Sequence, residues 1–382
     1  MRPVSLYVHV PFCRRRCPYC TFYHVPRTDR RLESAFLRSL VNEFESASAE
    51  MGEAVFFPTV YVGGGTPSVL ERPSLESIVE MVAERLAPDG AELTVEVNPE
   101  DVTGDLLEMF AGLGFNRISA GVQSMSDPGQ KTLGRCAPGV NQRALTHIKE
   151  QFANYNVDLL LGIPGGTDRS LKETLDRIDE FRPPHVSVYC LEPGGVLEPS
   201  SLKFFDRVNQ DRAADEYLLV CGSLEERGYR HYEVSNFALP GFECRHNLVY
   251  WQNQPYLGFG VSAASYLDGE RWKNTRNLST YVTRVRAGSS PIAESERLSP
   301  ESAFAEALML ALRTGEGADL RNLSGTFRVD PASLCAAPIR RLSADNLIEE
   351  SLGRIRLTRQ GRLLADYVCA QFLQEDSLPG CR

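Results

Sequence analysis

The sequence predicts an α/β fold: a partial (β/α)6, TIM-like barrel with a C-terminal α+β extension. Short apolar β-runs alternate with longer amphipathic stretches along the first half of the chain. Strand, crossover helix and strand at this spacing indicate parallel βαβ units. Chemically distinctive residues follow the strands, where the sites of such barrels lie. The expected strands cover 6–10, 59–62, 93–97, 117–121, 157–161 and 186–191.

Amphipathic stretches with helical periodicity separate these β-runs. The first helix is expected directly after a cysteine-rich loop, with Asp29 in the N-cap position. The expected helices cover 29–50, 74–87, 101–112, 140–152 and 169–181.

The totals indicate a globular protein with two or three domains, because 382 residues exceed one ordinary domain. The hydrophobic content of 42% and the charged content of 24% are typical of that class. No apolar run reaches the ~20 residues of a membrane span, and the N-terminus lacks a charged-then-apolar leader. We therefore expect a cytoplasmic location with reduced cysteines, while peripheral membrane contact stays open.

The charge is unevenly distributed. The net charge of −9 argues against general nucleic-acid binding, yet residues 1–38 carry eight arginines against Asp29 and Glu33. Such a basic collar is suited to docking an acidic, flavodoxin-like electron donor. A solvated loop is the alternative interpretation. The arginines are Arg2, Arg14, Arg15, Arg16, Arg27, Arg30, Arg31 and Arg38.

The loop after the first β-run holds Cys13, Cys17 and Cys20 in the spacing C-x3-C-x2-C. Three thiolates this close can hold three corners of a [4Fe–4S] cluster and leave the fourth iron without a protein ligand. A partial zinc site is the alternative, but no fourth ligand closes it, and His24 is the nearest candidate. A disulfide is disfavoured because ten cysteines in this chain are sparse.

Further motifs follow the later strands. Gly64, Gly65 and Thr66 belong to a GGGTP turn, whose glycines let the backbone approach a ligand closely. Glu96 follows the third strand, where a carboxylate accepts hydrogen bonds from hydroxyls or an ammonium group. Asp158 lies within an apolar strand, which is costly without a partner, so we expect an ion pair with Arg135.

Together these motifs resemble the radical S-adenosylmethionine (SAM) superfamily and, within it, the oxygen-independent coproporphyrinogen III dehydrogenases and their relatives. The resemblance covers nearly the whole chain through YVHVPFC, CPYCTF, GGGTP, EVNPE, SAGVQS and DLLLGIPG. It implies that the free iron chelates SAM and that an electron from the cluster cleaves it to a 5′-deoxyadenosyl radical. The implied SAM residues are Tyr7, Tyr19, Gly64, Gly65, Thr66, Glu96, Gln123, Arg135 and Asp158, the last three lining a second SAM site in the dehydrogenase.

Two departures distinguish the chain from the dehydrogenase. Phe22 occupies the position of a further cysteine, and Cys13 follows the start of the chain almost at once. Both features resemble the HemW-type heme chaperones instead. These also carry an HNxxYW motif associated with heme binding, which His246, Asn247, Tyr250 and Trp251 reproduce.

The chemistry of this motif is compatible with heme. An imidazole ligates heme iron axially, and aromatic rings offer flat faces to a porphyrin. A satisfied core histidine is the structural alternative, and Cys244 competes as the ligand.

The tail from 299 to 372 resembles a winged-helix domain. Helical patterns cover 301–312 and 331–342, a two-stranded wing covers 347–357, and a last helix covers 359–372. The negative net charge favours a lid or partner surface over DNA binding. A linker is expected at 288–291, and 375–382 as an unstructured end. The predicted domains are a cluster-binding barrel (1–200), a heme-binding segment (201–287) and the winged helix (292–374).

The resemblance implies a heme chaperone of radical SAM fold that binds heme, a [4Fe–4S] cluster and SAM, and transfers heme to apo-proteins. The alternative is an anaerobic coproporphyrinogen III dehydrogenase, which removes two propionate carboxyls through the deoxyadenosyl radical, or another radical SAM enzyme that modifies porphyrins. A winged-helix DNA-binding regulator that senses redox state through the cluster is a third class. The heme recipient, SAM cleavage, covalent attachment of heme and the oligomeric state stay open.

Overall fold

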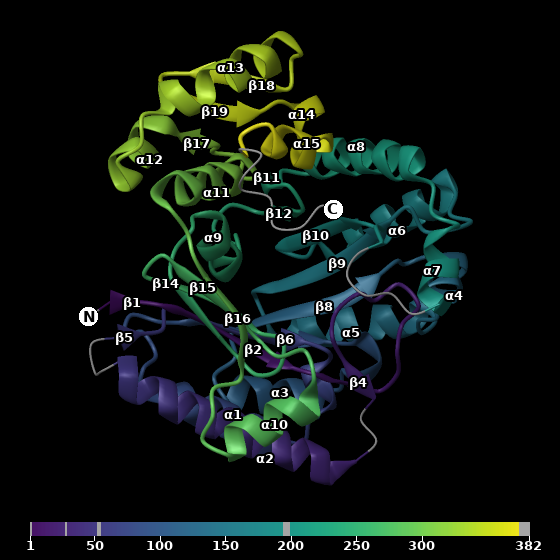
Figure 1. Ribbon diagram of the computed structural model, residues 1–382. Helices are drawn as coiled ribbons and strands as arrows, with labels where there is room; N and C mark the ends of the chain where they lie inside the picture. The colour runs from purple at the N-terminus through teal and green to yellow at the C-terminus, as the bar shows by residue number, and fades with distance from the viewer. Residues whose placement is uncertain (1, 27–28, 52–54, 194–198, 374–382) are drawn as a thin grey trace.

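The computed structural model describes residues 2–26, 29–51, 55–193 and 199–373. All six predicted strands form and lie side by side in chain order within one large, open sheet (Figure 1). Adjacent strands among the six are parallel, which confirms the βαβ prediction. The strands are β2 (Ser5–Val10), β6 (Thr59–Gly64), β7 (Glu92–Val97), β8 (Arg117–Gln123), β9 (Tyr155–Leu161) and β10 (His185–Cys190).

Helices follow these strands and pack their apolar faces on the sheet. Asp29 caps the first helix as predicted, because its Oδ1 accepts from the backbone N of Arg31 at 2.7 Å. Phe44 on this helix packs edge-on against Phe57 and Phe259 and so joins the helix to the sheet. The helices are α1 (Arg30–Met51), α2 (Arg72–Ala83), α3 (Gly104–Gly112), α4 (Asp127–Thr132), α5 (Pro138–Gln151), α6 (Asp168–Phe181), α7 (Pro199–Phe205) and α8 (Gln210–Glu226).

The sheet extends beyond the predicted strands on both sides. One edge gains β13 (Tyr256–Phe259), parallel to β2, and then antiparallel β14 (Ala264–Leu267), β15 (Glu270–Asn274) and β16 (Ile292–Arg297). The other edge gains β12 (Asn236–Ala238) and β11 (Arg230–Glu233). The expected linker at 288–291 precedes β16, which still belongs to this sheet, and the domain boundaries stay predictions.

Shorter elements complete this part of the chain. They are β1 (Arg2–Pro3), β3 (Phe12–Cys13), β4 (Val25–Pro26), β5 (Val55–Phe56), the 3-10 turns η1 (Pro67–Val69) and η2 (Pro99–Asp101), α9 (Arg245–Trp251) and α10 (Leu278–Arg286).

The C-terminal elements have the order and small sheet of a winged helix, as predicted. They are α11 (Pro300–Leu312), β17 (Ala318–Asp319), α12 (Leu320–Phe327), α13 (Pro331–Ala344), β18 (Ile348–Ser351) and β19 (Arg354–Leu357). Their apolar side chains form a core of their own. The expected last helix is divided at Leu364 into α14 (Arg359–Leu363) and α15 (Ala365–Ala370), and 375–382 lie outside the described residues.

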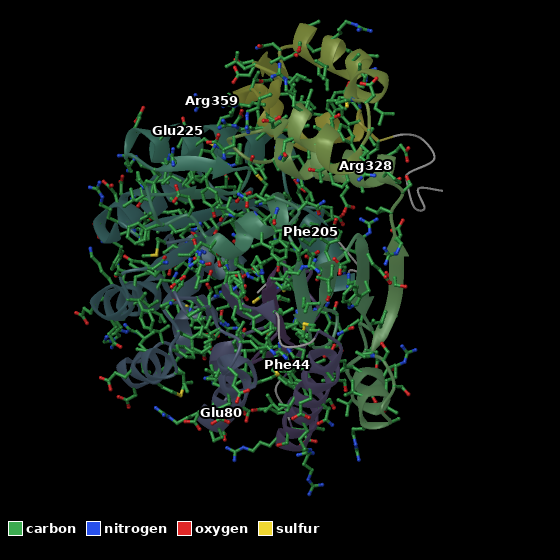
Figure 2. The ribbon with its side chains drawn as sticks, turned by 90° about the vertical axis from the view of Figure 1, so that its left-hand side faces the viewer. Phe44, Glu80, Phe205, Glu225, Arg328 and Arg359 are labelled. Carbon is green, nitrogen blue, oxygen red and sulfur yellow. The ribbon has the colours of Figure 1, made fainter. Side chains whose placement is uncertain are left out.

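The winged helix lies at one end of the molecule, beside α8 and α9 (Figures 1 and 2). Arg359 donates to the backbone oxygen of Leu218 at 3.1 Å, and Arg362 lies 4.0 Å from Glu225. Among the described residues, no helix is both long and apolar enough to cross a bilayer.

Candidate functional site

One cavity of about 360 Å³ opens at the C-terminal ends of the parallel strands. Cys13, Cys17 and Cys20, which follow β2, line it together. Their thiols are free. Three free thiols therefore line one cavity, and their role as ligands stays a prediction.

The donor set fits an iron–sulfur cluster better than a single ion. Within the described part of the chain, no three His, Cys, Asp or Glu side chains converge on one point as a zinc ion requires. A cubane cluster instead takes one thiolate at each of several separate irons. Cys13, Cys17 and Cys20 are the residues that would hold it, and it would supply one-electron chemistry there.

The cysteine loop is fixed against the glycine turn. The backbone N of Gly65 donates to Val10 O at 2.7 Å, and that of Thr66 donates to Phe12 O at 2.8 Å. A Cβ on Gly65 would lie 2.7 Å from the same Phe12 oxygen, so only glycine permits this approach. Burial raises the pKa of the Cys13 thiol to about 11, and its contact with Thr66 opposes the rise.

Glu96 lies behind the glycine turn with both carboxylate oxygens engaged. Tyr61 donates its hydroxyl to Oε1 at 2.9 Å, and the backbone N of Gly64 donates to Oε2 at 3.0 Å. Burial and then the nearby Asp158 raise the pKa of Glu96 to about 7. The backbone amides of Gly64, Gly65 and Thr66 are thus occupied, so the backbone of the turn can offer a ligand only its carbonyl oxygens.

The predicted ion pair between Arg135 and Asp158 is wrong. Arg135 donates to Gly121 O at 2.6 Å and to Cys17 Sγ at 3.7 Å, and so belongs to the cysteine loop. Asp158 instead accepts from Asn156 Nδ2 at 2.7 Å. A neutral amide satisfies the buried carboxylate, whose pKa burial raises.

Gln123 ends β8 in a left-handed conformation, with φ of +68°. The register of β8 against β9 also shifts between Ala120 and Gln123. Both features turn the Gln123 side chain into the cavity wall.

Every residue predicted to bind SAM lines this cavity except Tyr7. Tyr19 contributes its ring and lies 6.4 Å from the ring of Phe204. Tyr7 is instead packed against the rings of Tyr61 and His246, and its hydroxyl lies 3.1 Å from His9 Nδ1. Tyr7 therefore lies behind the cavity wall and does not line the cavity.

The cavity reaches deeper than the sequence predicted. Polar side chains from β8, β9 and β10 line its inner part: Arg117, Ser119, Asn156 and Ser187. They lie at alternate positions with Gln123, Asp158 and Tyr189, on the face of the sheet that points inward. That alternation was a signal in the sequence, although only two of these positions were named from it.

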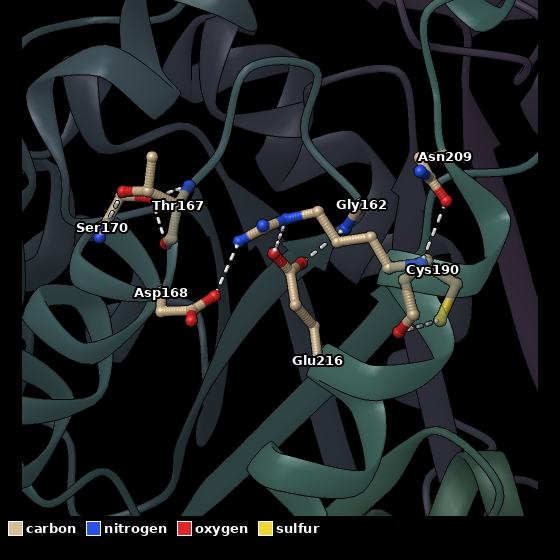
Figure 3. A network of polar contacts seen from close by, with 9 residues as sticks. Gly162, Thr167, Asp168, Ser170, Cys190, Asn209 and Glu216 are labelled. Atoms are coloured by element: carbon tan, nitrogen blue, oxygen red, sulfur yellow. Dashed lines mark hydrogen bonds and ion pairs between the residues drawn. The ribbon is translucent and has the colours of Figure 1, made fainter.

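A polar network holds the turn that follows β9, the strand that carries Asp158. Glu216 on α8 accepts from the backbone N of Gly162 and from Arg212 Nε, each at 2.8 Å (Figure 3). Arg212 also reaches Asp168 at the start of α6, at 3.1 Å. Helix α8 is thereby connected to the turn after β9 and to the start of α6, about fifty residues earlier in the chain.

The four residues of the HNxxYW motif do not gather around one pocket. His246 is fully buried, with Nδ1 at 2.7 Å from Thr59 Oγ1 and Nε2 at 2.8 Å from the Tyr250 hydroxyl. Burial, and then Arg117, lower its pKa to about 3. Both ring nitrogens of this histidine are therefore engaged in the core.

The other two residues of the motif face different openings. Asn247 reaches the inner end of the cluster cavity, whereas Trp251 lines a groove of about 1030 Å³ between α9 and the winged helix. Arg313 stacks over Trp251 at 5.9 Å from the ring centroid. Cys244 is fully buried, and its thiol donates to Glu92 Oε1 at 3.6 Å. The helix thus separates cavity from groove.

Four of the eight arginines of the predicted basic collar pair with acidic side chains from elsewhere in the chain. Arg14 pairs with Asp101, and Arg15 lies 3.0 Å from Glu100. The same holds for two further arginines, in the pairs Arg2–Asp268 at 2.8 Å and Arg30–Glu71 at 2.5 Å.

Comparisons with known proteins agree with these features. The Radical SAM superfamily model matches residues 7–178, and the HemN C-terminal domain model matches 298–364. Among solved structures, the coproporphyrinogen III oxidase HemN of Escherichia coli, a radical SAM enzyme, superposes with a TM-score of 0.85 at 25% identity. The match covers 97% of this chain and 90% of that one.

Several curated relatives bear one name, heme chaperone HemW. The Lactococcus lactis protein is 34% identical over 98% of both chains, and the Mycobacterium tuberculosis protein is 35% identical over 97% of this chain and 95% of its own. The Bacillus subtilis protein is 30% identical over 97% of this chain and 99% of its own. The chain therefore belongs to the HemW family, within the radical SAM superfamily.

Proposed function

We propose that this protein is a heme chaperone of radical SAM fold, which binds a [4Fe–4S] cluster, SAM and heme, and transfers heme to apo-proteins. The observation that carries the proposal is full-length similarity to HemW relatives, combined with three cysteines that line one cavity. Cys13, Cys17 and Cys20 are the proposed cluster ligands, and the wall residues from Gly64 to Asp158 the proposed SAM contacts. We place the protein in the cytoplasm.

The contacts of α9 assign different roles to the heme motif. Asn247 and Trp251 are the residues that can touch a ligand without rearrangement, since each lines an opening. His246 holds the helix on the sheet through its buried hydrogen bond to Thr59, and Tyr250 bonds to His246 within the same helix. Axial ligation by His246 would require its bond to Tyr250 to break.

The test is a heme titration of anaerobically cluster-reconstituted protein, followed through the Soret band. Saturable one-to-one binding, and passage of the heme to apomyoglobin as acceptor, are the expected results. Absence of saturable binding would contradict the proposal.

Variants of α9 locate the heme. Trp251→Ala is expected to weaken heme binding by about tenfold, because a lost aromatic contact costs on the order of 1 kcal/mol or more. Tyr250→Phe is the matched control, because it removes only a buried hydroxyl and should lower thermal stability instead. If Tyr250→Phe alone abolished heme binding at unchanged stability, the buried pair itself would be the heme site.

Because the fold resembles that of coproporphyrinogen III oxidase, oxidation of coproporphyrinogen III is the alternative function. Phe22, which is 69% exposed at the cavity rim, stands where that family carries a further cysteine, so we expect no turnover. Oxidation of coproporphyrinogen III with SAM and a reductant, without oxygen, would replace the chaperone proposal by this activity.

We still propose an acidic electron donor, but the basic surface on which it would dock is smaller than the sequence suggested. Four arginines of the collar already pair with acidic side chains of the chain itself. Reduction of the cluster by a flavodoxin should therefore depend only weakly on salt.

A further inference from the structure

Arg117 is the most deeply buried charged side chain beside the cavity. It begins β8, is 1% exposed and lines the inner part of the cavity. Its Nε has no hydrogen-bond partner, and no carboxylate of the described residues lies within ion-pair distance of its guanidinium. Glu92 favours the charged form of Arg117 from a distance, but a buried guanidinium without a contacting counter-ion is costly, so a fold that keeps one here requires a reason.

The carboxylates around Arg117 are committed to other donors. Glu92 accepts from the backbone N of His246 at 3.0 Å and from that of Arg245 at 3.2 Å, which caps α9. Asp158 accepts from Asn156, and both oxygens of Glu96 are engaged by Tyr61 and Gly64. None of these three carboxylates forms an ion pair with the guanidinium by direct contact, although Glu92 and Asp158 interact with it from a distance.

The surroundings of Arg117 are those of a polar ligand site rather than of a hydrophobic core. Ser119, Asn156 and Ser187 line the cavity beside it, and Asn247 of the HNxxYW motif lines the same space. Arginine is well suited to a carboxylate because its planar fork matches the two oxygens.

We propose that Arg117 is the anchor of a carboxylate-bearing ligand at the inner end of the cavity. Two sources carry this chemistry: a propionate of a porphyrin, or the amino-acid carboxylate of a SAM molecule. The choice of these two sources rests on the proposed function. The anchor itself rests on the buried, unpaired guanidinium.

The sources are distinguished by ligand chemistry. Heme is compared with heme dimethyl ester, which lacks the carboxylates, on the reconstituted wild type, Arg117→Gln and Arg117→Lys. If a propionate docks here, wild type binds heme at least about tenfold more tightly than the ester, and Arg117→Gln loses that preference, because charge-assisted hydrogen bonds are the strong ones. If the SAM carboxylate docks here, Arg117→Gln lowers SAM affinity about tenfold and leaves the heme–ester ratio unchanged.

Controls keep the result interpretable. Arg177→Gln removes an exposed arginine on α6, remote from the cavity, and should change neither affinity. Arg117→Lys keeps the positive charge and should retain part of the preference for heme over the ester. This variant provides the test if Arg117→Gln folds poorly. Equal affinities of wild type and Arg117→Gln for both ligands would overturn the anchor while leaving heme binding, and so the proposed function, intact.

A measurement that uses neither heme nor SAM tests the Arg117 anchor even if the proposed function is wrong. Glutarate, a plain dicarboxylate, should raise the melting temperature of wild-type apoprotein, should do so less for Arg117→Lys and should leave that of Arg117→Gln unchanged. An equal response of wild type and Arg117→Gln overturns the anchor, whatever the protein does with heme.

Discussion

Gln123, in the cavity wall, has a backbone conformation that lowers the stability of the folded protein. A side chain in the left-handed region is about 1–2 kcal/mol less stable than glycine would be there. Its φ of +68° is held by the irregular pairing at the end of β8. The conformation is what turns the amide into the cavity, so stability and ligand contact oppose one another at this residue.

We therefore expect Gln123→Gly to raise the free energy of unfolding by about 1 kcal/mol and to weaken SAM binding. Chemical denaturation and equilibrium dialysis with SAM measure the two effects. Leu352→Gly is the matched control, because Leu352 is also left-handed, with φ of 54°, but is 97% exposed at the wing tip. It should gain similar stability without any change in SAM affinity, and unchanged SAM binding in Gln123→Gly would remove Gln123 from the site.

Single residues differ in how well their roles follow from the sequence. The three cysteines share a site because they are local in sequence, and a loop of eight residues cannot carry them far apart. For His246 the sequence offered a core role only as an alternative, because its partner Thr59 is distant in sequence and the bond depends on how α9 packs. Arg117 could have been noticed, since it alternates with Ser119 and Gln123 on one strand face.

At the scale of elements, the network around Glu216 joins α8 to the turn after β9 and to α6 (Figure 3). The side chain of Glu216 is 9% exposed, whereas that of Asp168 is 94% exposed. Glu216→Ala is expected to lower the free energy of unfolding by about 1–3 kcal/mol, because the Gly162 amide and Arg212 lose a buried acceptor. Asp168→Asn should change it by less than about 0.5 kcal/mol. Equal effects in urea denaturation would show that the network does not hold the turn.

The elements that were predicted correctly are those whose hydrophobic residues recur with a strong strand or helix periodicity. Alternating strands and amphipathic helices over the first half were correct, because each buries one apolar face on the sheet. The six residues of β16 are all exposed, so no apolar alternation in their pattern indicated a strand. The strand pairs with β15 through its backbone and through the ion pairs Arg271–Glu296 and Arg297–Glu270. The division of the last helix at Leu364 follows from packing on the winged-helix core, which a local pattern does not contain.

At the scale of the whole molecule, three buried carboxyl groups connect its parts. Glu43 on α1 accepts from the Tyr281 hydroxyl at 2.5 Å, from Asn274 Nδ2 at 2.5 Å and from Gly260 N at 2.9 Å, which ties α1 to the added edge of the sheet. Glu96 lies in the cavity, and Glu233 lies in β11, beside the winged helix. Burial is the largest cause that raises the pKa of each to about 7.

These carboxyls make the folded apoprotein hold protons that the unfolded chain has released. Because the folded pKa is raised, each contribution to stability is complete below about pH 4.5 and is lost as the pH rises through 7. Buried histidines oppose this trend below pH 6.5, since burial lowers the pKa of His9 and His231 to about 4. The difference in the free energy of unfolding between a variant and wild type, followed against pH, therefore isolates one carboxyl better than the pH dependence of wild type alone.

Glu43→Gln is expected to lose one such contribution. Between pH 5 and pH 8, the free energy of unfolding of wild type should fall by about 3 kcal/mol relative to that of Glu43→Gln, whatever the offset between them at pH 5. Guanidinium titrations of both apoproteins at the two pH values measure this difference. Glu80→Gln, which changes an exposed carboxyl on α2, should run parallel to wild type. Parallel behaviour of Glu43→Gln as well would mean that Glu43 is ionised in the folded protein at pH 5, held charged by its three donors against the cost of burial.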